Sequence, residues 1–473
     1  MEFDAVVVGS GPNGLAAAIT LARQQRSVLV LEAADTIGGG MRSAELTLPG
    51  FVHDICSAIH PLGVASPFFQ QVPLEDFGLR WIEPDLPVAH PLPNGTAGYL
   101  HRSLESSLDA LGSDAKAYRR LIEPLLDRSD DLFRNILAPI GIPASPILMT
   151  RFGLRGLPSS RHLAYSRFRD ERVRGLIAGM AAHSILPLNS WLTASVAVMF
   201  LVTVHCTGWP FPAGGAQALA DAMTRYLESL GGKIKTGSTV RSLDDIPRCK
   251  AMFFDVSPRN LVSIVGKRLP QRYRDKLIKF KHGPGVFKVD WALREPIPWT
   301  AEACRRAGTV HVGGTFDEVA QSEKAAWQAT PSDRPFVLVA QHTPFDSSRA
   351  PQGHHTAWGY CHVPAGCDVD MTERIENQLE RFAPGFKDVI LDKHVMTPCA
   401  FEQYNANYIG GDITGGVMNW KQILARPTMG KNPYQTPDPE IFLCSASTPP
   451  GGGVHGMCGF HAAQSALRSV LRD

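Results

Sequence analysis

The sequence predicts an α/β protein whose N-terminal segment forms a dinucleotide-binding unit. A second segment, near residue 456, is expected to contact the same bound nucleotide. Three observations support this prediction. A glycine-rich turn joins a buried strand to a helix within residues 3–24, and an acidic residue follows the next strand. A second glycine-rich loop precedes a helix at the far end of the chain. Strand, glycine turn and helix in this order are typical of Rossmann-type nucleotide sites.

The first unit is "FDAVVVGSGPNGLAAAITLARQQRSVLVLEAAD". We expect strands at residues 3–8 and 27–31, because both runs are short and apolar, and a helix at residues 14–24. The glycines permit a tight turn and close approach of a pyrophosphate to the helix N-terminus, and the acid accepts hydrogen bonds from a ribose. The residues expected to bind the cofactor here are Gly9, Gly11, Pro12, Asn13, Gly14, Glu32 and Ala33.

A second glycine turn follows the acid in "EAADTIGGGMRS". It lets another backbone segment approach the cofactor, and its arginine offers a charged fork to phosphate. This arrangement closely resembles the FAD-binding signature of the glutathione reductase-like flavoproteins, which favours FAD over NAD. The expected cofactor contacts in this turn are Gly39, Gly40, Met41 and Arg42.

The loop "TPPGGGVHG", residues 448–456, formally has the G-x-G-x-x-G spacing, yet only 17 residues follow Gly456. No second nucleotide unit fits there. "EIFLCSAS" before it predicts a strand and "GFHAAQSALRSVLR" after it predicts a closing helix, whose positive N-terminus favours negative charge. We therefore expect Gly452, Gly453 and Val454 to hold the flavin ring. An ordinary helix-capping turn is the alternative.

Taken together, the two glycine-rich regions resemble the phytoene desaturase-like flavoproteins. "GWPFPAGGAQALADAM" and "GPGVFKVDWALREPIPW" are most similar to a mitochondrial and bacterial branch of pyridine nucleotide-disulfide oxidoreductase-like proteins. Pro449 departs from the carotene desaturases, which commonly have histidine at that position. The resemblance implies FAD and a residue at Val240 whose backbone meets the adenine.

The implied fold class is α/β. It consists of a glutathione reductase-like FAD-binding domain of the Rossmann type and a discontinuous substrate domain that contains a mixed sheet and helices. Residues 1–65, 208–280 and 405–473 would form the FAD-binding domain. Residues 66–207 would form a mainly helical substrate or cap region, and residues 281–404 a sheet-rich substrate domain.

Composition excludes several classes of function. With 473 residues, 44% of them hydrophobic, the chain can build two or three domains. Its net charge of +2 gives no reason to expect nucleic acid as a partner. The nine cysteines show no C-x-x-C and no ligand spacing with histidine, so no metal is expected. The oligomeric state is left open.

A charge-free stretch from Gly175 to Ala220 contains "WLTASVAVMFLVTVHCTGW". Its Thr, Ser and His residues and the flanking prolines favour a buried helix over a membrane span. An apolar substrate tunnel, or a surface that contacts lipid, is the alternative. Because "MEFDAVVVGS" enters a strand at once and leaves no room for a signal peptide, we expect a cytoplasmic protein, with membrane association left open.

Two side chains are catalytic candidates. "GVFKVDWAL" predicts a strand with Lys288 and Asp290 on one face, and this motif is similar to the amine oxidase strand whose lysine is water-bonded to flavin N5. Pairing of Lys288 with Asp290 is the alternative. His455 lies in the flavin loop, where it can approach the ring or cap the backbone.

The predicted function is an FAD-dependent oxidoreductase, a dehydrogenase of the desaturase kind that takes hydride from an apolar isoprenoid or polyene substrate. Since the chain has one complete nucleotide unit, oxygen or a quinone is the expected electron acceptor. A flavin amine oxidase, a redox-neutral flavin isomerase and a non-catalytic lipid-binding escort remain alternatives.

Overall fold

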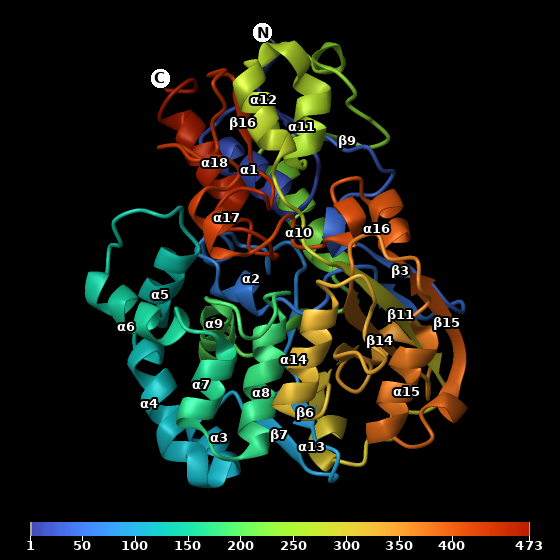
Figure 1. Cartoon of the computed structure of the whole chain (residues 1–473). Coiled ribbons are helices and arrows are strands. Elements are labelled where there is room, and N and C mark those ends of the chain that lie inside the picture. The colour runs from blue at the N-terminus through green and yellow to red at the C-terminus, as the bar shows by residue number, and fades with distance from the viewer. Residues whose placement is uncertain (1, 473) are drawn as a thin grey trace.

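The computed structural model describes residues 2–472, and a five-stranded parallel sheet organises its nucleotide-binding part (Figure 1). The strand order β16-β10-β1-β2-β9 brings together segments from both ends of the chain. This confirms the predicted α/β class with a Rossmann-type domain. The strands are Phe3–Val8 (β1), Val28–Leu31 (β2), Lys233–Lys235 (β9), Cys249–Phe254 (β10) and Ile441–Leu443 (β16).

Helices α1 (Pro12–Ala22) and α18 (Met457–Leu467) pack against each other beside this sheet. α1 begins two residues before the predicted start, because proline suits the first helical position. The approach is close: a Cβ atom built on Gly459 of α18 would lie 1.8 Å from the carbonyl oxygen of Asn13. The two ends of the chain therefore meet at the top of Figure 1. Other helices of this part are Gln217–Ser229 (α10), Pro258–Val265 (α11) and Gln271–Ile278 (α12).

A mixed seven-stranded sheet forms the second part, in the order β15-β11-β14-β13-β12-β6-β7. Two of its strands come from residues 66–207, the region expected to be mainly helical, and β6 pairs in parallel with β12. The strands are Leu86–Pro91 (β6), Ala97–Leu100 (β7), Gly285–Leu293 (β11), Ala307–Val312 (β12), Val337–Gln341 (β13), His355–Val363 (β14) and Ile390–Met396 (β15).

The two faces of this sheet differ in chemistry. One face carries Val289, Val310 and Val339, and packs into an apolar core with helix α15 (Thr372–Phe382). Successive residues of a strand point to opposite faces. The other face therefore carries polar side chains in adjoining rows, with Asp290 opposite Trp358 and Lys288 opposite Tyr360. Helices α8 (Glu171–Ala182) and α14 (Phe316–Ala325) cover this polar face.

Helices α3 to α7 and α9 lie at the lower left of the molecule in Figure 1. The charge-free stretch contains α9, which is 14 residues long and buried along most of its length. Within residues 2–472, no helix is long and apolar enough to cross a membrane. These helices, with the short ones elsewhere, are Pro61–Ala65 (α2), Leu104–Leu111 (α3), Ala115–Leu126 (α4), Ser129–Ile136 (α5), Pro146–Gly156 (α6), Ser160–Arg167 (α7), Thr193–Cys206 (α9), Glu302–Arg305 (α13), Pro398–Tyr404 (α16) and Trp420–Leu424 (α17).

Two short strand pairs lie outside the large sheets and shape the segments that lead into the site. Ser43–Glu45 (β3) pairs with Val52–Asp54 (β4), and Trp81–Ile82 (β5) pairs with Phe211–Pro212 (β8). Both pairs are antiparallel.

The contact between α1 and α18 predicts a stability effect at Gly459. Alanine is the better helix former, yet Gly459→Ala places a methyl group against the Asn13 carbonyl, so we expect a loss of about 1–3 kcal/mol in the free energy of unfolding. Urea unfolding measures it. Gly153→Ala on α6, where nothing lies within 4 Å, is the control and should be neutral or stabilising by up to about 1 kcal/mol. Equal behaviour of the two variants contradicts the prediction.

Candidate cofactor and substrate site

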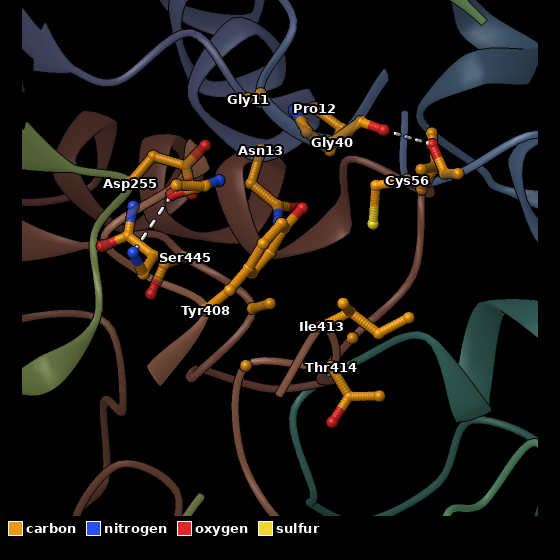
Figure 2. Close-up of a pocket in the computed structure, with 18 of the residues that line it drawn as sticks. Gly11, Pro12, Asn13, Gly40, Cys56, Asp255, Tyr408, Ile413, Thr414 and Ser445 are labelled. Carbon is orange, nitrogen blue, oxygen red and sulfur yellow. Dashed lines mark hydrogen bonds between the residues drawn. The ribbon is translucent and has the colours of Figure 1, made fainter. Parts of the chain in front are cut away.

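A cavity of about 950 Å³ lies where the two sheets meet. Figure 2 shows Gly11, Pro12 and Gly40 on one side of it and Ile413 and Thr414 on the other. Segments from distant parts of the chain line it, including residues 238–241, 403–408 and 445–447. A volume of this size is within the range of cofactor and ligand sites, about 300–1,000 Å³.

The two N-terminal glycine turns pack directly on each other. A Cβ atom on Gly39 would lie 2.9 Å from the Cα atom of Gly11, and one on Gly11 would lie 2.6 Å from Oδ2 of Asp255. Larger residues would fill the space beside the N-terminus of α1. The glycines thus keep a backbone-lined cradle at the positive end of a helix, which is suited to a pyrophosphate.

Glu32 follows β2, as predicted, and its carboxylate holds the first turn in place. It accepts hydrogen bonds from the backbone nitrogen and the hydroxyl of Ser10, at 2.8 and 2.6 Å, and from the nitrogen of Ala34 at 2.9 Å. Arg42 lies 3.3 Å away as its ion-pair partner. The acid therefore orders the loops around the cavity in addition to lining it.

Asp255 is a site residue that the sequence analysis missed. It directly follows β10 and accepts a 2.8 Å hydrogen bond from the nitrogen of Gly14. One N–H at the start of α1 is thereby occupied by a carboxyl group of the protein. Burial raises the pKa of Asp255 to about 7, and the charge of Glu32 adds to the shift. The available signal was an acid at the end of a buried strand, the same pattern that identified Glu32.

The C-terminal loop also reaches the cavity. A Cβ atom on Gly452 would lie 2.5 Å from the carbonyl oxygen of Thr414, so this loop packs closely on residues 412–418. The imidazole of His455 is turned away from the cavity: its Nδ1 accepts a 3.1 Å hydrogen bond from the nitrogen of Met457 at the start of α18. Burial lowers the pKa of His455 to about 4. This geometry is the backbone-capping arrangement given above as the alternative.

Most of the predicted cofactor residues line this one cavity. Two do not. Gly14 donates to Asp255, and Met41 is fully buried in the core. Those that line it are Gly9, Gly11, Pro12, Asn13, Glu32, Ala33, Gly39, Gly40, Arg42, Val240, Gly452, Gly453 and Val454.

Lys288 does not line the cavity. It forms a buried ion pair with Asp290, as in the alternative given above, and its ammonium lies 5.4 Å from the centre of the Trp358 ring. His53 and His394 approach the same carboxylate at 3.7 and 3.5 Å. Desolvation lowers the pKa of His53 to about 4. The lysine charge is thus balanced inside the protein by Asp290, and the Trp358 ring that it approaches is part of the cavity wall.

The part of the cavity between α8, α9 and the seven-stranded sheet is here called the inner chamber. Its polar groups are uncharged: His183 forms a 3.1 Å contact with His311, and burial lowers the pKa of His183 to about 3. No Asp, Glu, Lys or Arg of the described chain lines this part. Its walls are Leu62, His183, Ser184, Ile185, Val196, Met199, Phe200, Trp209, Thr309, Leu338, Trp358 and Tyr360.

Among residues 2–472, no group of three or more His, Cys, Asp or Glu side chains is placed to hold a metal ion. The charged groups that line the cavity, including Arg42 and Arg241, all lie in its nucleotide part.

Comparisons with known proteins agree with this arrangement. A model of the NAD(P)-binding Rossmann-like domain matches residues 7–72. Pyridine nucleotide-disulfide oxidoreductase domain-containing protein 2 of Mus musculus is 24% identical, over 99% of this chain and 94% of the relative. Phytoene desaturase (lycopene-forming) of Pseudescherichia vulneris is also 24% identical, over 98% of each chain. Both relatives thus match this chain along nearly its whole length.

Solved structures agree on the fold. A triple mutant of putrescine oxidase superposes with a TM-score of 0.64, at 18% identity, and covers 100% of this chain and 99% of its own. An oxidoreductase from Methanosarcina mazei gives 0.66 at 16% identity, over 98% and 100% of the two chains. At these identities the likeness establishes a shared fold.

Asp255 predicts a pH dependence of stability. A carboxyl whose pKa is about 7 when folded and near 3.8 when unfolded binds its proton more tightly in the folded state. Its contribution is therefore fully present at low pH and is lost as the pH rises toward about 7, by up to about 1.4 kcal/mol per unit. Asp255→Asn should flatten this part of the curve of unfolding free energy against pH.

Asp4→Asn is the matched control for Asp255. The Lys250 partner lowers the pKa of the Asp4 carboxyl to about 2, so it does not titrate in the same interval. Above about pH 4, this variant should shift the curve without changing its slope. An Asp255→Asn curve that is parallel to the wild type would refute the assignment.

Proposed function

We propose that the chain is an FAD-dependent dehydrogenase acting on an apolar substrate of the isoprenoid or polyene class, because it is similar along nearly its whole length to a phytoene desaturase and to a pyridine nucleotide-disulfide oxidoreductase domain-containing protein. The observation that carries the proposal is the inner chamber, which is apolar, partly aromatic and uncharged, and is continuous with the nucleotide part of the same cavity.

Residues of the cavity fit FAD. Oδ1 of Asn13 and Nε of Arg42 are buried without a hydrogen-bond partner, and both residues line the nucleotide part. Such atoms are costly unless a ligand satisfies them. The glycine cradle would hold the pyrophosphate, and the loop at Gly452 and Gly453 would hold the ring. When bound, FAD supplies a two-electron acceptor for hydride.

The inner chamber supports an apolar substrate. Leu62, Met199 and Phe200 provide contact area without charge, and His183 is kept neutral by burial. A hydrocarbon chain can therefore displace water from the chamber without leaving an ion unsolvated. Removal of water also strengthens the field of nearby dipoles where hydride would leave the substrate.

An amine oxidase activity is less well supported. The putrescine oxidase likeness concerns the fold, and Lys288 is already paired with Asp290. A substrate ammonium is best stabilised by a carboxylate, and no acidic side chain of the described chain lines the inner chamber. The stacked rings of Trp358 and Tyr360 are the feature of the chamber that suits a cation. An escort role leaves the two glycine-lined loops unexplained. A redox-neutral isomerase would use the same residues, so only the reaction that the protein catalyses distinguishes an isomerase from a dehydrogenase.

The roles of the two catalytic candidates follow from their positions. Lys288 and His455 do not touch the cavity, so in this proposal they act on the surroundings of the cofactor. Lys288 would place a fixed charge behind Trp358, and His455 would fix the start of α18. We propose oxygen or a quinone as the electron acceptor, because a single nucleotide unit lines the cavity.

The proposal predicts which compounds reduce the bound flavin. We expect anaerobic bleaching of the flavin band by isoprenoid or polyene compounds and none by diamines or monoamines, because the chamber lacks a counter-ion for ammonium. Stopped-flow absorbance measures the bleaching, and admission of oxygen or a quinone tests reoxidation. Bleaching by amines alone would overturn the proposed substrate class, and protein that cannot be loaded with flavin would overturn the cofactor.

We further propose that the surface around α6 contacts anionic lipid. Ile142 is fully exposed, and Ile147, Leu154 and Trp191 each expose about 70% of their surface. Ile147 and Leu154 lie seven residues apart, on one face of α6, with the exposed Arg151 between them. Apolar groups beside arginine are suited to the interface of an anionic bilayer. An apolar substrate would be available in that phase.

The lipid proposal predicts sedimentation with phosphatidylglycerol vesicles. The double variant Ile147→Glu, Leu154→Glu should sediment several-fold less, because two charges would enter the acyl boundary. Ile278→Glu, on α12 in the nucleotide-binding part, is the control with comparable exposure and should sediment like the wild type. Unchanged sedimentation of the double variant would show that this surface does not contact lipid.

A further inference from the structure

Arg426 is a buried cation directly behind the C-terminal cofactor loop. It follows α17 and is 2% exposed. Its guanidinium donates to the carbonyl oxygens of Gly415 at 3.1 Å and Ala446 at 2.9 Å, and more weakly to that of Ser447 at 3.4 Å. Its fourth partner is the sulfur of Met418, at 2.8 Å. The residues that supply all four acceptors line the cavity.

These partners are neutral. No carboxylate in residues 2–472 forms an ion pair with Arg426, and the remaining contact is the ring of Phe280, whose centre lies 5.8 Å from the guanidinium carbon. The charge of the buried Asp412 carboxylate raises the pKa of Arg426, but this carboxylate accepts its hydrogen bonds from Thr414, Gly416 and Gly283. Burial lowers the pKa of Arg426 to about 10, so it remains charged at neutral pH.

The neighbouring thiol does not supply a further negative charge. Burial raises the pKa of the Cys458 thiol to about 11, and this thiol donates to the carbonyl oxygens of Thr448 and Gly451. Arg426 thus has a counter-charge in Asp412 but no direct ion pair, and an anionic group in the adjacent cavity would stabilise it further.

A second positive source faces the same loop. Helix α18 begins at Met457, directly after the glycine loop, and directs its N-terminus toward it. Nη1 of Arg426 lies 3.0 Å from the position that a Cβ atom would take on Gly451, so the guanidinium and the helix end flank one segment. His455 adds no charge because its pKa is lowered to about 4.

We propose that Arg426 is a positioning residue that favours the reduced, negatively charged state of the flavin ring. The inference rests on the proposed flavin function. Transfer of a hydride, which is one proton with two electrons, adds one negative charge to the ring. Arg426 orders the loops at Gly415 and Ala446 against the ring and supplies the compensating charge through them.

The test measures bound flavin without any substrate. In Arg426→Gln we expect about tenfold weaker binding of sulfite, which adds to the oxidised ring and leaves it anionic. The same tenfold change corresponds to a fall of about 30 mV in the two-electron midpoint potential. Arg426→Lys, which keeps the charge but not the fork, should recover most of both values. Lys421→Gln, an exposed cation on the neighbouring α17, should change neither.

The proposal would be overturned if Arg426→Gln bound sulfite within twofold of the wild-type affinity and had a midpoint potential within a few millivolts of the wild-type value. It would also be overturned by a lysine variant that behaves like the glutamine variant. A second measurement does not depend on the glutamine variant folding: a pH titration of the reduced wild-type protein should find the ring anionic at pH values where free reduced flavin is protonated. A neutral ring there would also overturn it. Failure of the wild type to bind flavin would instead overturn the proposed function.

Discussion

The close packing of α1 on α18 is the contact on which the rest of the site depends. Because Gly459 carries no side chain, α18 reaches the backbone of Asn13, and the loops that precede both helices open into the same cavity. Residues separated by more than 400 positions thus share one cofactor site. The parallel sheet supports this arrangement, since β1 and β16 flank β10 and both end at the cavity.

Charge is distributed unevenly along the cavity. Its nucleotide part contains Glu32, Arg42 and the helix N-termini, and its inner chamber contains no ionised side chain of the described residues. The seven-stranded sheet has charged residues on the face toward the chamber, but Lys288 and Asp290 neutralise each other behind Trp358. Ion pairing within the sheet therefore lets a polar face border an apolar chamber.

Local sequence patterns predicted the parts of the site that depend on short segments. β1 and β11 match their expected bounds, and most of the expected glycine-loop residues line the cavity. β6 was not predicted, because Pro87 and Pro91 weaken any strand signal and its pairing with β12 joins residues about 220 positions apart. Asp255 follows a buried strand as Glu32 does, but its role depends on the contact with Gly14, which lies 241 positions away in the sequence. Long-range contacts decided both cases.

The position of Arg426 extends this electrostatic asymmetry. Arg426 is buried, donates to neutral carbonyl groups and has no direct ion pair, so an anion at the cavity wall formed by Gly415 and Ala446 would stabilise it beyond what Asp412 provides. In the inner chamber no charge would stabilise an ionic product. Transfer of negative charge into the loop at residues 451–453 is therefore favoured at that end of the cavity, and the chamber favours a substrate that stays uncharged. Desaturation meets both conditions when the hydride leaves one carbon for the flavin and a proton leaves the neighbouring carbon for water or a base, so that the product in the chamber is a neutral alkene.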